Sequence, residues 1–501
     1  MRHYVGIDLG TSAVKVLVLR EDGVVVAKSS EPYPLKHPAP GRSEQSVDDW
    51  WNALGRATRT ALAEGGVTGA TDVASVALSG QLNGLVLLDE RFDPLEDVWI
   101  WLDLRSADLA RELQREHGAL FRRAVENPAN PIYVGAKLAW LARERPDLHD
   151  RVRHVLLAKD VINLRLTGRI ATDHSDASCT LLYALRDSDW DEDLLAIAHT
   201  SRDLLPPLYP SDEVIGHVTT EAARFTGLPV GTPVAAGAGD VAALAVGSGA
   251  VDVGTYAVTL GTAGHVVSIA EDVTEAGYDR IWQMRHPVPD RIIRLGLVMS
   301  GGLCLQWFAR HFGGQGEPTP AVYEHLMSEA ATSQPGANGV LFLPFLEGSA
   351  TPFQDPSLTA TFHGFRTAHG RSDATRAVIE GVAYNVRDCM DLLEEIGTPA
   401  IEVRLSEGGS RSPLWCQVIA DVIRRPVVTL RERDSSALGA AILAMKAVSE
   451  RTLTEVVDTL LGDIHDARFE PDAERAAVYD ERYGAYRDLI RRLRDGSSTE
   501  P

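Results

Sequence analysis

Gly6-Ile7-Asp8-Leu9-Gly10-Thr11-Ser12 is the first of two glycine-threonine segments in this chain of 501 residues, and the second is Thr259-Leu260-Gly261-Thr262-Ala263-Gly264. Each segment adjoins an apolar run that is typical of a buried strand, residues 3–7 for the first and 255–260 for the second. Glycines permit tight turns in which backbone N–H groups approach phosphate oxygens. The pair therefore predicts two strand-ending turns that bind one polyphosphate, although either segment alone is better explained as an ordinary hairpin turn.

The first segment also carries a carboxylate. Asp8 offers hard oxygen ligands that are suited to holding Mg²⁺, directly or through water, between phosphate groups. The phosphate-binding residues predicted from the two turns are Gly10, Thr11, Ser12, Gly261 and Thr262.

The net charge of −21 restricts the partners of the chain. Nucleic-acid surfaces need clustered Lys and Arg, which this acidic chain lacks, so we expect no nucleic-acid partner. An anionic ligand must instead be bound locally, by backbone N–H groups, helix N-termini and metal. No segment approaches the roughly 20 apolar residues of a membrane helix, and the N-terminus lacks the features of a signal peptide. We therefore expect a cytoplasmic protein without a membrane span.

Length and periodicity predict an α/β protein of two domains. A chain of 501 residues exceeds the size at which a single core stops growing. Residues 105–204 are rich in helical patterns and are expected to cap one side of a cleft. A second three-strand unit begins near Val253, which places a domain boundary near 248–252. The first elements are expected as strands over 3–9, 13–20 and 23–28, a helix over 46–64 and a strand over 73–78.

Asp240 opens a predicted helix over 241–248. The positive end of the helix macrodipole is expected to keep its carboxylate ionised, although an aspartate at this position is also a common helix cap. In the second half we expect helices over 374–396 and 436–448 and a glycine-rich turn over 407–410. The small residues of 436–448 allow close approach, either of a neighbouring helix or of a ligand ring.

Further motifs occur in a fixed order between these segments. They are Ser43-Glu44-Gln45, Gly80-Gln81, Lys159-Asp160, Thr167-Gly168, Asp173 to Ser178, Gly239-Asp240, Glu380-Gly381, Gly408 to Ser412 and Ala437 to Ala441. In these residues the chain resembles the FGGY family of carbohydrate kinases over nearly its whole length, and within that family it is most similar to the xylulokinases.

The resemblance implies two actin-like or hexokinase-like (ribonuclease H-like) domains around a central cleft. It implies an N-terminal sugar-binding domain over 1–249, a C-terminal nucleotide-binding domain over 250–450, and a helical segment with a polar tail over 451–501. The implied activity is ATP-dependent phosphorylation of a terminal hydroxyl of a small ketose, with D-xylulose converted to xylulose 5-phosphate and with ATP and Mg²⁺ required. A homodimer is the default expectation for such an enzyme.

The resemblance also assigns roles to single residues. Asp240 and Asp8 are the implied catalytic residues, the first as the general base towards the sugar hydroxyl and the second as the organiser of Mg²⁺. The implied substrate-binding residues are Gln81, Leu82, Asn83, Trp101, Asp103, Arg105 and Asp240. The implied nucleotide-binding residues beyond the two turns are Gly408, Gly409, Ser410 and Gly439.

Several positions depart from the xylulokinase pattern. Asn83 stands where histidine is expected, Leu102 where asparagine is expected, and Val241 follows the predicted base in place of asparagine. Glu407 replaces the first glycine of a triple and brings negative charge close to the predicted nucleotide site, unless its side chain points away. Ser349-Ala350 stands before Thr351-Pro352, where the family pattern has Glu-Arg. A changed set of polar side chains rejects some hydroxyl patterns and accepts others.

Two alternatives therefore remain open at the level of the sequence. The enzyme could phosphorylate another ketose or a short polyol, with the same chemistry. A protein of a different class, a non-catalytic actin-like protein that binds nucleotide to drive a conformational change in a partner, has the same fold.

Overall fold

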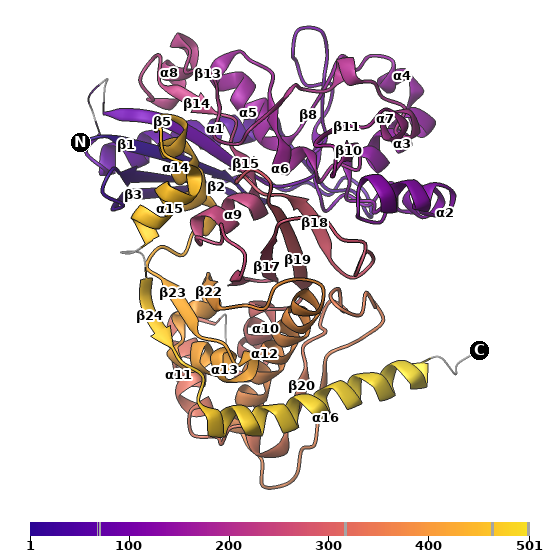
Figure 1. Ribbon diagram of the computed structural model, residues 1–501, viewed down its shortest axis with the longest axis vertical. Helices are drawn as coiled ribbons and strands as arrows, with labels where there is room; N and C mark the ends of the chain where they lie inside the picture. The colour runs from indigo at the N-terminus through magenta and orange to yellow at the C-terminus, as the bar shows by residue number, and fades with distance from the viewer. Residues whose placement is uncertain (68, 70–71, 315–317, 462–464, 498–501) are drawn as a thin grey trace.

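The computed structural model describes residues 1–67, 69, 72–314, 318–461 and 465–497. Two seven-stranded sheets organise the molecule, one in the upper and one in the lower half of Figure 1. The first sheet has the order β13-β14-β5-β1-β2-β3, with β15 paired to β5 as well. Its strands are β1 (His3–Leu9), β2 (Ala13–Arg20), β3 (Val25–Pro32), β5 (Val73–Gly80), β13 (Val214–His217), β14 (Pro233–Ala235) and β15 (Ala238–Gly239).

The second sheet repeats this arrangement, with the order β18-β19-β17-β16-β22-β23-β24. Three antiparallel strands in the first sheet, and four in the second, are followed by two parallel pairings and a final antiparallel strand. The β1–β2 turn and the β16–β17 turn therefore occupy equivalent places in the two halves. The strands are β16 (Thr255–Leu260), β17 (Gly264–Ala270), β18 (Trp282–Arg285), β19 (Ile292–Val298), β22 (Glu402–Ser406), β23 (Val427–Leu430) and β24 (His465–Phe469).

Helices cover both sheets, and a largely helical region extends from the first one. This region forms the upper right of Figure 1 and contains the helices of the segment expected to cap a cleft. Its elements are α2 (Ala107–Ala124), α3 (Val134–Glu144), α4 (Pro146–His149), α5 (Ala158–Thr167), α6 (His174–Ala177) and α7 (Glu192–Ile197). The other helices are α1 (Val47–Glu64), α8 (Thr220–Thr226), α9 (Asp240–Gly247), α10 (Gly302–Phe312), α11 (Pro320–Ala330), α12 (Arg371–Glu395), α13 (Pro413–Ile423), α14 (Ser435–Ala447), α15 (Leu453–Leu461) and α16 (Ala473–Ser497).

Short elements complete the chain. Two-stranded pairs join β4 (Glu44–Gln45) to β7 (Val98–Trp99) and β6 (Val86–Leu88) to β8 (His154–Leu156). The remaining short strands are β9 (Thr172–Asp173), β10 (Tyr183–Ala184), β11 (Asp189–Trp190), β12 (Leu208–Tyr209), β20 (Leu341–Leu343) and β21 (Thr361–His363), and the 3₁₀ helices are η1 (Arg202–Leu204), η2 (Ala337–Gly339) and η3 (Gly408–Arg411).

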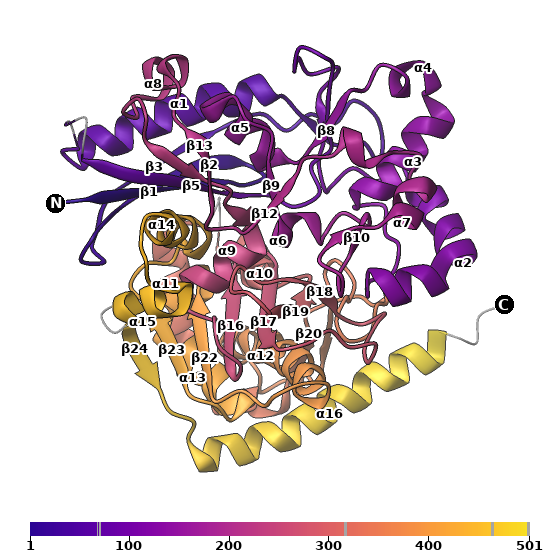
Figure 2. The same ribbon diagram turned by 45° about the horizontal axis from the view of Figure 1, so that its top comes forward.

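Two helices cross between the sheets and join the two halves. Helices α9 and α14 lie side by side there (Figure 2), and apolar residues of both share one buried cluster with residues of each sheet. Glycines allow this contact, because a Cβ at Gly439 would overlap the carbonyl oxygen of Ala243, and a Cβ at Gly247 would overlap that of Ser435. Helix α14 also packs on β1, where a Cβ at Gly6 would overlap Ala437. The start of α9 is therefore held rigidly where the two sheets meet.

The elements for which the sequence analysis gave bounds match the observed ones within a few residues. The sequence predicted a helical segment after residue 450, whereas β24 in that segment pairs with β23. The predicted domain boundaries stay a prediction, and α14 packs on the sheet of the N-terminal half although it follows β23. In the part of the chain that the structure describes, no helix is long and apolar enough to cross a membrane.

Candidate active site

Side-chain hydrogen bonds to its carbonyl oxygens fix the first turn, Gly10 to Ser12. The carbonyl of Gly10 accepts from Gln81 Nε2 at 3.3 Å and from the hydroxyl of Tyr33. The carbonyl of Thr11 accepts from Gln45 Nε2 at 2.6 Å. With its carbonyls engaged on one side, the turn is fixed, and Ser12 is exposed on its surface.

The second turn, Gly261 and Thr262, is fixed by the start of α10. The N–H of Gly302 donates to the carbonyl of Gly261 at 2.6 Å, and the N–H groups of Gly301 and Leu303 donate to that of Thr262 at 3.0 and 3.1 Å. The Thr262 side chain is exposed. Sequence reasoning missed Gly301 and Gly302, although two adjacent glycines at the start of a helix were a usable signal.

Asp8 and Asp240 are the two carboxylates of the site. Asp8 ends β1 and accepts a hydrogen bond from Ser79 Oγ at 2.9 Å. Burial raises the pKa of Asp8, while nearby Lys15 opposes the rise. Asp240 is the first residue of α9 and is half-buried, and its Oδ1 accepts from the N–H of Val241 at 2.8 Å. The helix cap is Gly239, so the capping alternative for Asp240 is wrong.

The expectation that the helix terminus keeps Asp240 ionised is also wrong. Burial, with a further contribution from the charge of Asp8, raises the pKa of Asp240 from 3.8 to about 7. The desolvation cost and the like charge therefore outweigh the helix macrodipole. Because the charge of Asp8 acts on Asp240, the two carboxylates belong to one electrostatic site.

The segment after β5 leads directly to this site. Leu82 is in contact with the residue before Asp240, since a Cβ at Gly239 would overlap Leu82 Cδ2. Asn83 has a left-handed backbone with φ of 64°, and its buried side-chain oxygen has no hydrogen-bond partner among the described residues. Gln81 is buried, and its amide donates to Gly10 and to Gln45, so it supports the first turn.

Of the three predicted substrate-binding residues near position 103, one is exposed and the side chains of the other two are buried. Trp101 is 40% exposed, and its Nε1 donates to Thr11 Oγ1 at 2.9 Å, which places the indole beside the first turn. Asp103 is fully buried and accepts from Arg105 Nε at 2.7 Å and from the N–H of Ser43 at 2.8 Å. The Arg105 side chain is 3% exposed and lies 3.8 Å from the ring centre of Trp99. Asp103 and Arg105 are ion-paired below the surface and hold the loop that carries Trp101, and their assignment to sugar binding stays a prediction.

A buried charge cluster lies behind Asp240, and sequence reasoning gave it no role. Lys159 Nζ lies 2.7 Å from Asp160, 3.0 Å from Asp173 and 3.3 Å from Asp176, and all four side chains are fully buried. Ser175 links this cluster to α9, because its hydroxyl donates to Asp173 at 2.5 Å and accepts from the N–H of Gly239 at 3.1 Å. The cluster therefore fixes the peptide that leads into Asp240.

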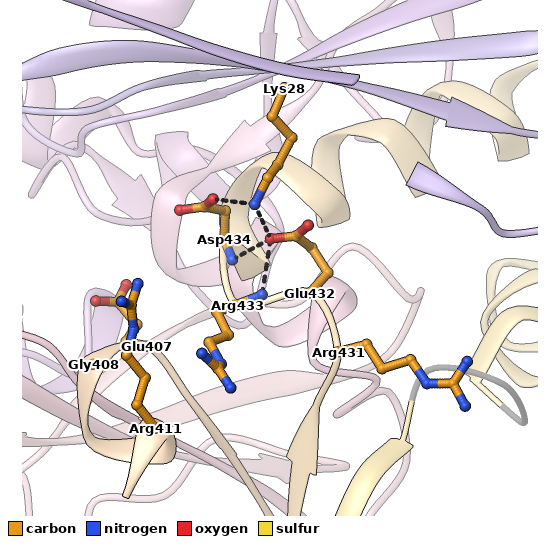
Figure 3. Close-up of a pocket in the computed structure, with 8 residues that line it drawn as sticks. All are labelled: Lys28, Glu407, Gly408, Arg411, Arg431, Glu432, Arg433 and Asp434. Carbon is orange, nitrogen blue, oxygen red and sulfur yellow. Dashed lines mark hydrogen bonds and ion pairs between the residues drawn. The ribbon is translucent and has the colours of Figure 1, made fainter. Parts of the chain in front are cut away.

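A pocket of about 250 Å³ lies next to the second turn (Figure 3). Gly408 is exposed and lines it, whereas Gly409 and Ser410 are buried behind it, Gly409 against Leu260. Gly439 does not line this pocket, because it lies at the contact of α14 with α9. The small residues of α14 therefore allow the close approach of a neighbouring helix, which was one of the two predicted alternatives. The pocket is lined by Lys28, Glu407, Gly408, Arg411, Arg431, Glu432, Arg433 and Asp434.

Ion pairs connect the two halves at this pocket. Lys15 of β2 lies 2.9 Å from Asp434. Lys28 of β3 lies 3.0 Å from Glu432 and 3.2 Å from Asp434, as Figure 3 shows. Among the described residues, no group of three or more His, Cys, Asp or Glu side chains could hold a metal ion. A metal at this site would thus bind few carboxylates and would take its other ligands from phosphate and water.

Comparison with known proteins places the chain in a family. Residues 3–247 match the N-terminal domain and residues 256–448 the C-terminal domain of the FGGY family of carbohydrate kinases. The xylulose kinase of Escherichia coli (strain K12) is 35% identical over 493 residues, which is 98% of this chain and 99% of that relative.

Two solved structures agree with this. The crystal structure of a kinase from Brucella ovis, described as a xyloylose kinase, has a TM-score of 0.89 and 31% identity, covering 99% of this chain and 100% of its own. That of the xylulose kinase from Rhodospirillum rubrum has a TM-score of 0.90 and 30% identity, covering 99% of both chains. The predicted α/β fold with two domains is confirmed. The chain belongs to the FGGY family of carbohydrate kinases and is an ATP-dependent enzyme of that family.

Proposed function

We propose that this enzyme transfers the γ-phosphoryl group of ATP to a terminal hydroxyl of D-xylulose and forms xylulose 5-phosphate and ADP. The relatives that match over the full chain are xylulose kinases, which supports the choice of sugar. The observation that carries the chemistry is the position of Asp240 as the first residue of α9, where burial and the charge of Asp8 raise its pKa. Because ATP is an intracellular substrate, the proposal also places the enzyme in the cytoplasm.

Asp240 is the general base of the proposed reaction. The sugar hydroxyl oxygen attacks the γ-phosphorus, the bond from that phosphorus to the bridging oxygen of ADP breaks, and the hydroxyl proton passes to Asp240. A base is most effective when its pKa lies near the working pH, and a value of about 7 meets this condition. Catalysis otherwise depends on positioning, which the rigid crossing of α9 and α14 supplies.

The two turns hold the triphosphate in this proposal. The N–H groups of Thr11 and Ser12 and of Gly261 and Thr262 face the phosphates, and the hydroxyls of Thr11 and Thr262 add donors. Gly10 shapes the first turn, because its N–H donates to the carbonyl of Ala13 at 3.2 Å. The carboxylate of Asp8 fits Mg²⁺, because its oxygens are hard ligands and a bound cation would offset the desolvation that raises its pKa. Mg²⁺ at this position, bound directly or through water, would neutralise the negative charge that develops on the phosphate oxygens during transfer. The pocket lined by Gly408 accepts the nucleoside part of ATP.

The sugar lies against Leu82, Asn83 and Trp101 in this proposal. The unpartnered side-chain oxygen of Asn83 is an acceptor that a sugar hydroxyl would satisfy. Because asparagine is shorter than histidine and cannot be protonated, the same residue favours a second candidate, the phosphorylation of another ketose or a short polyol.

A screen of ketoses and polyols with Mg-ATP, read as ADP release in a coupled assay, tests the proposal. We expect the highest kcat/KM with D-xylulose. A higher value with a different ketose or with a tetritol would replace the sugar but retain the chemistry. Release of ADP that does not depend on any sugar would contradict the proposal.

A further inference from the structure

Glu407 has a backbone conformation that normally requires glycine. It lies between β22 and η3 with φ of 66° and ψ of −156°. This region is populated almost only by glycine, because a Cβ there clashes with the neighbouring backbone. A side chain retained at such a position points to a function that offsets the strain.

The Glu407 carboxylate lies on the second turn. Its Oε2 is 2.5 Å from the point that a Cβ at Gly261 would occupy, so the carboxylate covers the Cα of that glycine. Figure 3 shows Glu407 beside Gly408 at the pocket. Glu407 therefore does not point away from the nucleotide site; it occupies space next to the N–H groups that would receive a phosphate.

Within the part of the chain that the structure describes, the Glu407 carboxylate forms no ion pair. Burial raises its pKa, Lys15 opposes the rise, and Asp434 and Asp8 add to it. Lys15 is itself ion-paired with Asp434 at 2.9 Å. By contrast, Glu432 in the same pocket accepts from Lys28 at 3.0 Å and from the N–H groups of Arg433 and Asp434 at 2.8 and 2.9 Å. Glu407 is thus the carboxylate that a phosphate entering the second turn would meet.

We propose that Glu407 sets the affinity of this enzyme for its nucleotide by competing with a phosphate group for the second turn. The proposal rests on the proposed function only in taking that turn as a phosphate site. Binding of nucleotide must displace the carboxylate or place a second negative charge beside it, and both weaken binding. The carboxylate thereby raises the nucleotide concentration at which the site fills.

Calorimetric titration with ADP, with and without Mg²⁺, tests this on three variants of the full chain. Glu407→Gln removes the charge, and we expect the Kd for ADP to fall by roughly three- to tenfold. Glu407→Gly removes the charge, the side chain and the strain, and we expect a fall of about tenfold or more together with a higher urea midpoint of unfolding. Glu432→Gln is the control in the same pocket, for which we expect no tightening, because its carboxylate is occupied by Lys28 and the backbone.

An unchanged or higher Kd in both Glu407 variants would overturn the proposal. So would equal tightening in Glu432→Gln, which would reveal a general effect of pocket charge, and so would a failure of every variant to bind ADP. Failure of the proposed function is a separate result: no tested sugar would stimulate ADP release in the wild type, while the order of the three Kd values would still hold.

Discussion

Replacing Asp240 by asparagine should stabilise the folded protein while removing its activity, and the gain should grow with pH. The pKa of Asp240 rises from 3.8 to about 7 on folding, because burial and the charge of Asp8 disfavour the ionised form. Below pH about 4 the carboxyl is protonated in both the folded and the unfolded states and costs nothing. Between pH 4 and 7 only the unfolded chain ionises, so stability is lost as the pH rises through 7.

The size of this effect follows from the shift. At about 1.4 kcal/mol per pKa unit, the ionisable Asp240 costs about 2 kcal/mol at pH 5 and about 4 kcal/mol at pH 8. Because Asp240 is only half-buried, solvent screens part of this cost, and we expect at least about half of each value. Asparagine does not titrate, so Asp240→Asn recovers the cost.

Urea unfolding of wild type and Asp240→Asn at pH 5 and pH 8 measures the gain. The exposed residue Asp252 provides the control, and Asp252→Asn should change the urea midpoint little at either pH. A gain of equal size at pH 5 and pH 8, or a loss of stability at pH 8, would refute the reasoning about Asp240.

Three further predictions concern the surroundings of the site. Gly439→Ala should destabilise the protein by about 3 kcal/mol, read from the urea midpoint, because its Cβ would overlap Ala243; wild-type stability would contradict the packing. Ser175→Ala should lower kcat about tenfold and alter the pH profile of kcat, with the KM for ATP unchanged, because it frees the peptide before the base; an unchanged kcat and pH profile would remove Ser175 as a positioning residue. Asn83→His combined with Leu102→Asn should raise kcat/KM for D-xylulose relative to other ketoses, and an unchanged ranking of substrates would show that these side chains do not select the sugar.

The elements of the fold could be predicted because periodicity is a local property. The strands around Gly10 and Gly261 are apolar runs that end in glycine, and both were placed within a few residues of the observed bounds. The strand β24 was missed because it is short and mostly exposed, so it lacks an apolar pattern of its own. It is a strand only because β23 lies beside it.

The site was predicted less completely, since it depends on neighbours that are distant in sequence. Gly439 looked equally suitable for a ligand or a helix, and only the crossing with α9 decides between them. The resemblance assigned Asp103 and Arg105 to substrate binding, and the ion pair that joins them beneath the surface could not be read from the sequence. The direction of the Glu407 side chain could not be predicted, because it lies on Gly261, which is far away in the sequence.

The central claim is that Asp240 takes the proton of a sugar hydroxyl while two separate turns hold the triphosphate. The most direct measurement compares the kcat for D-xylulose-dependent ADP formation in wild type and Asp240→Asn, with the Kd for ADP measured on both. We expect kcat to fall by about 10² to 10⁴ while the Kd changes little. Undiminished turnover in Asp240→Asn would contradict the claim.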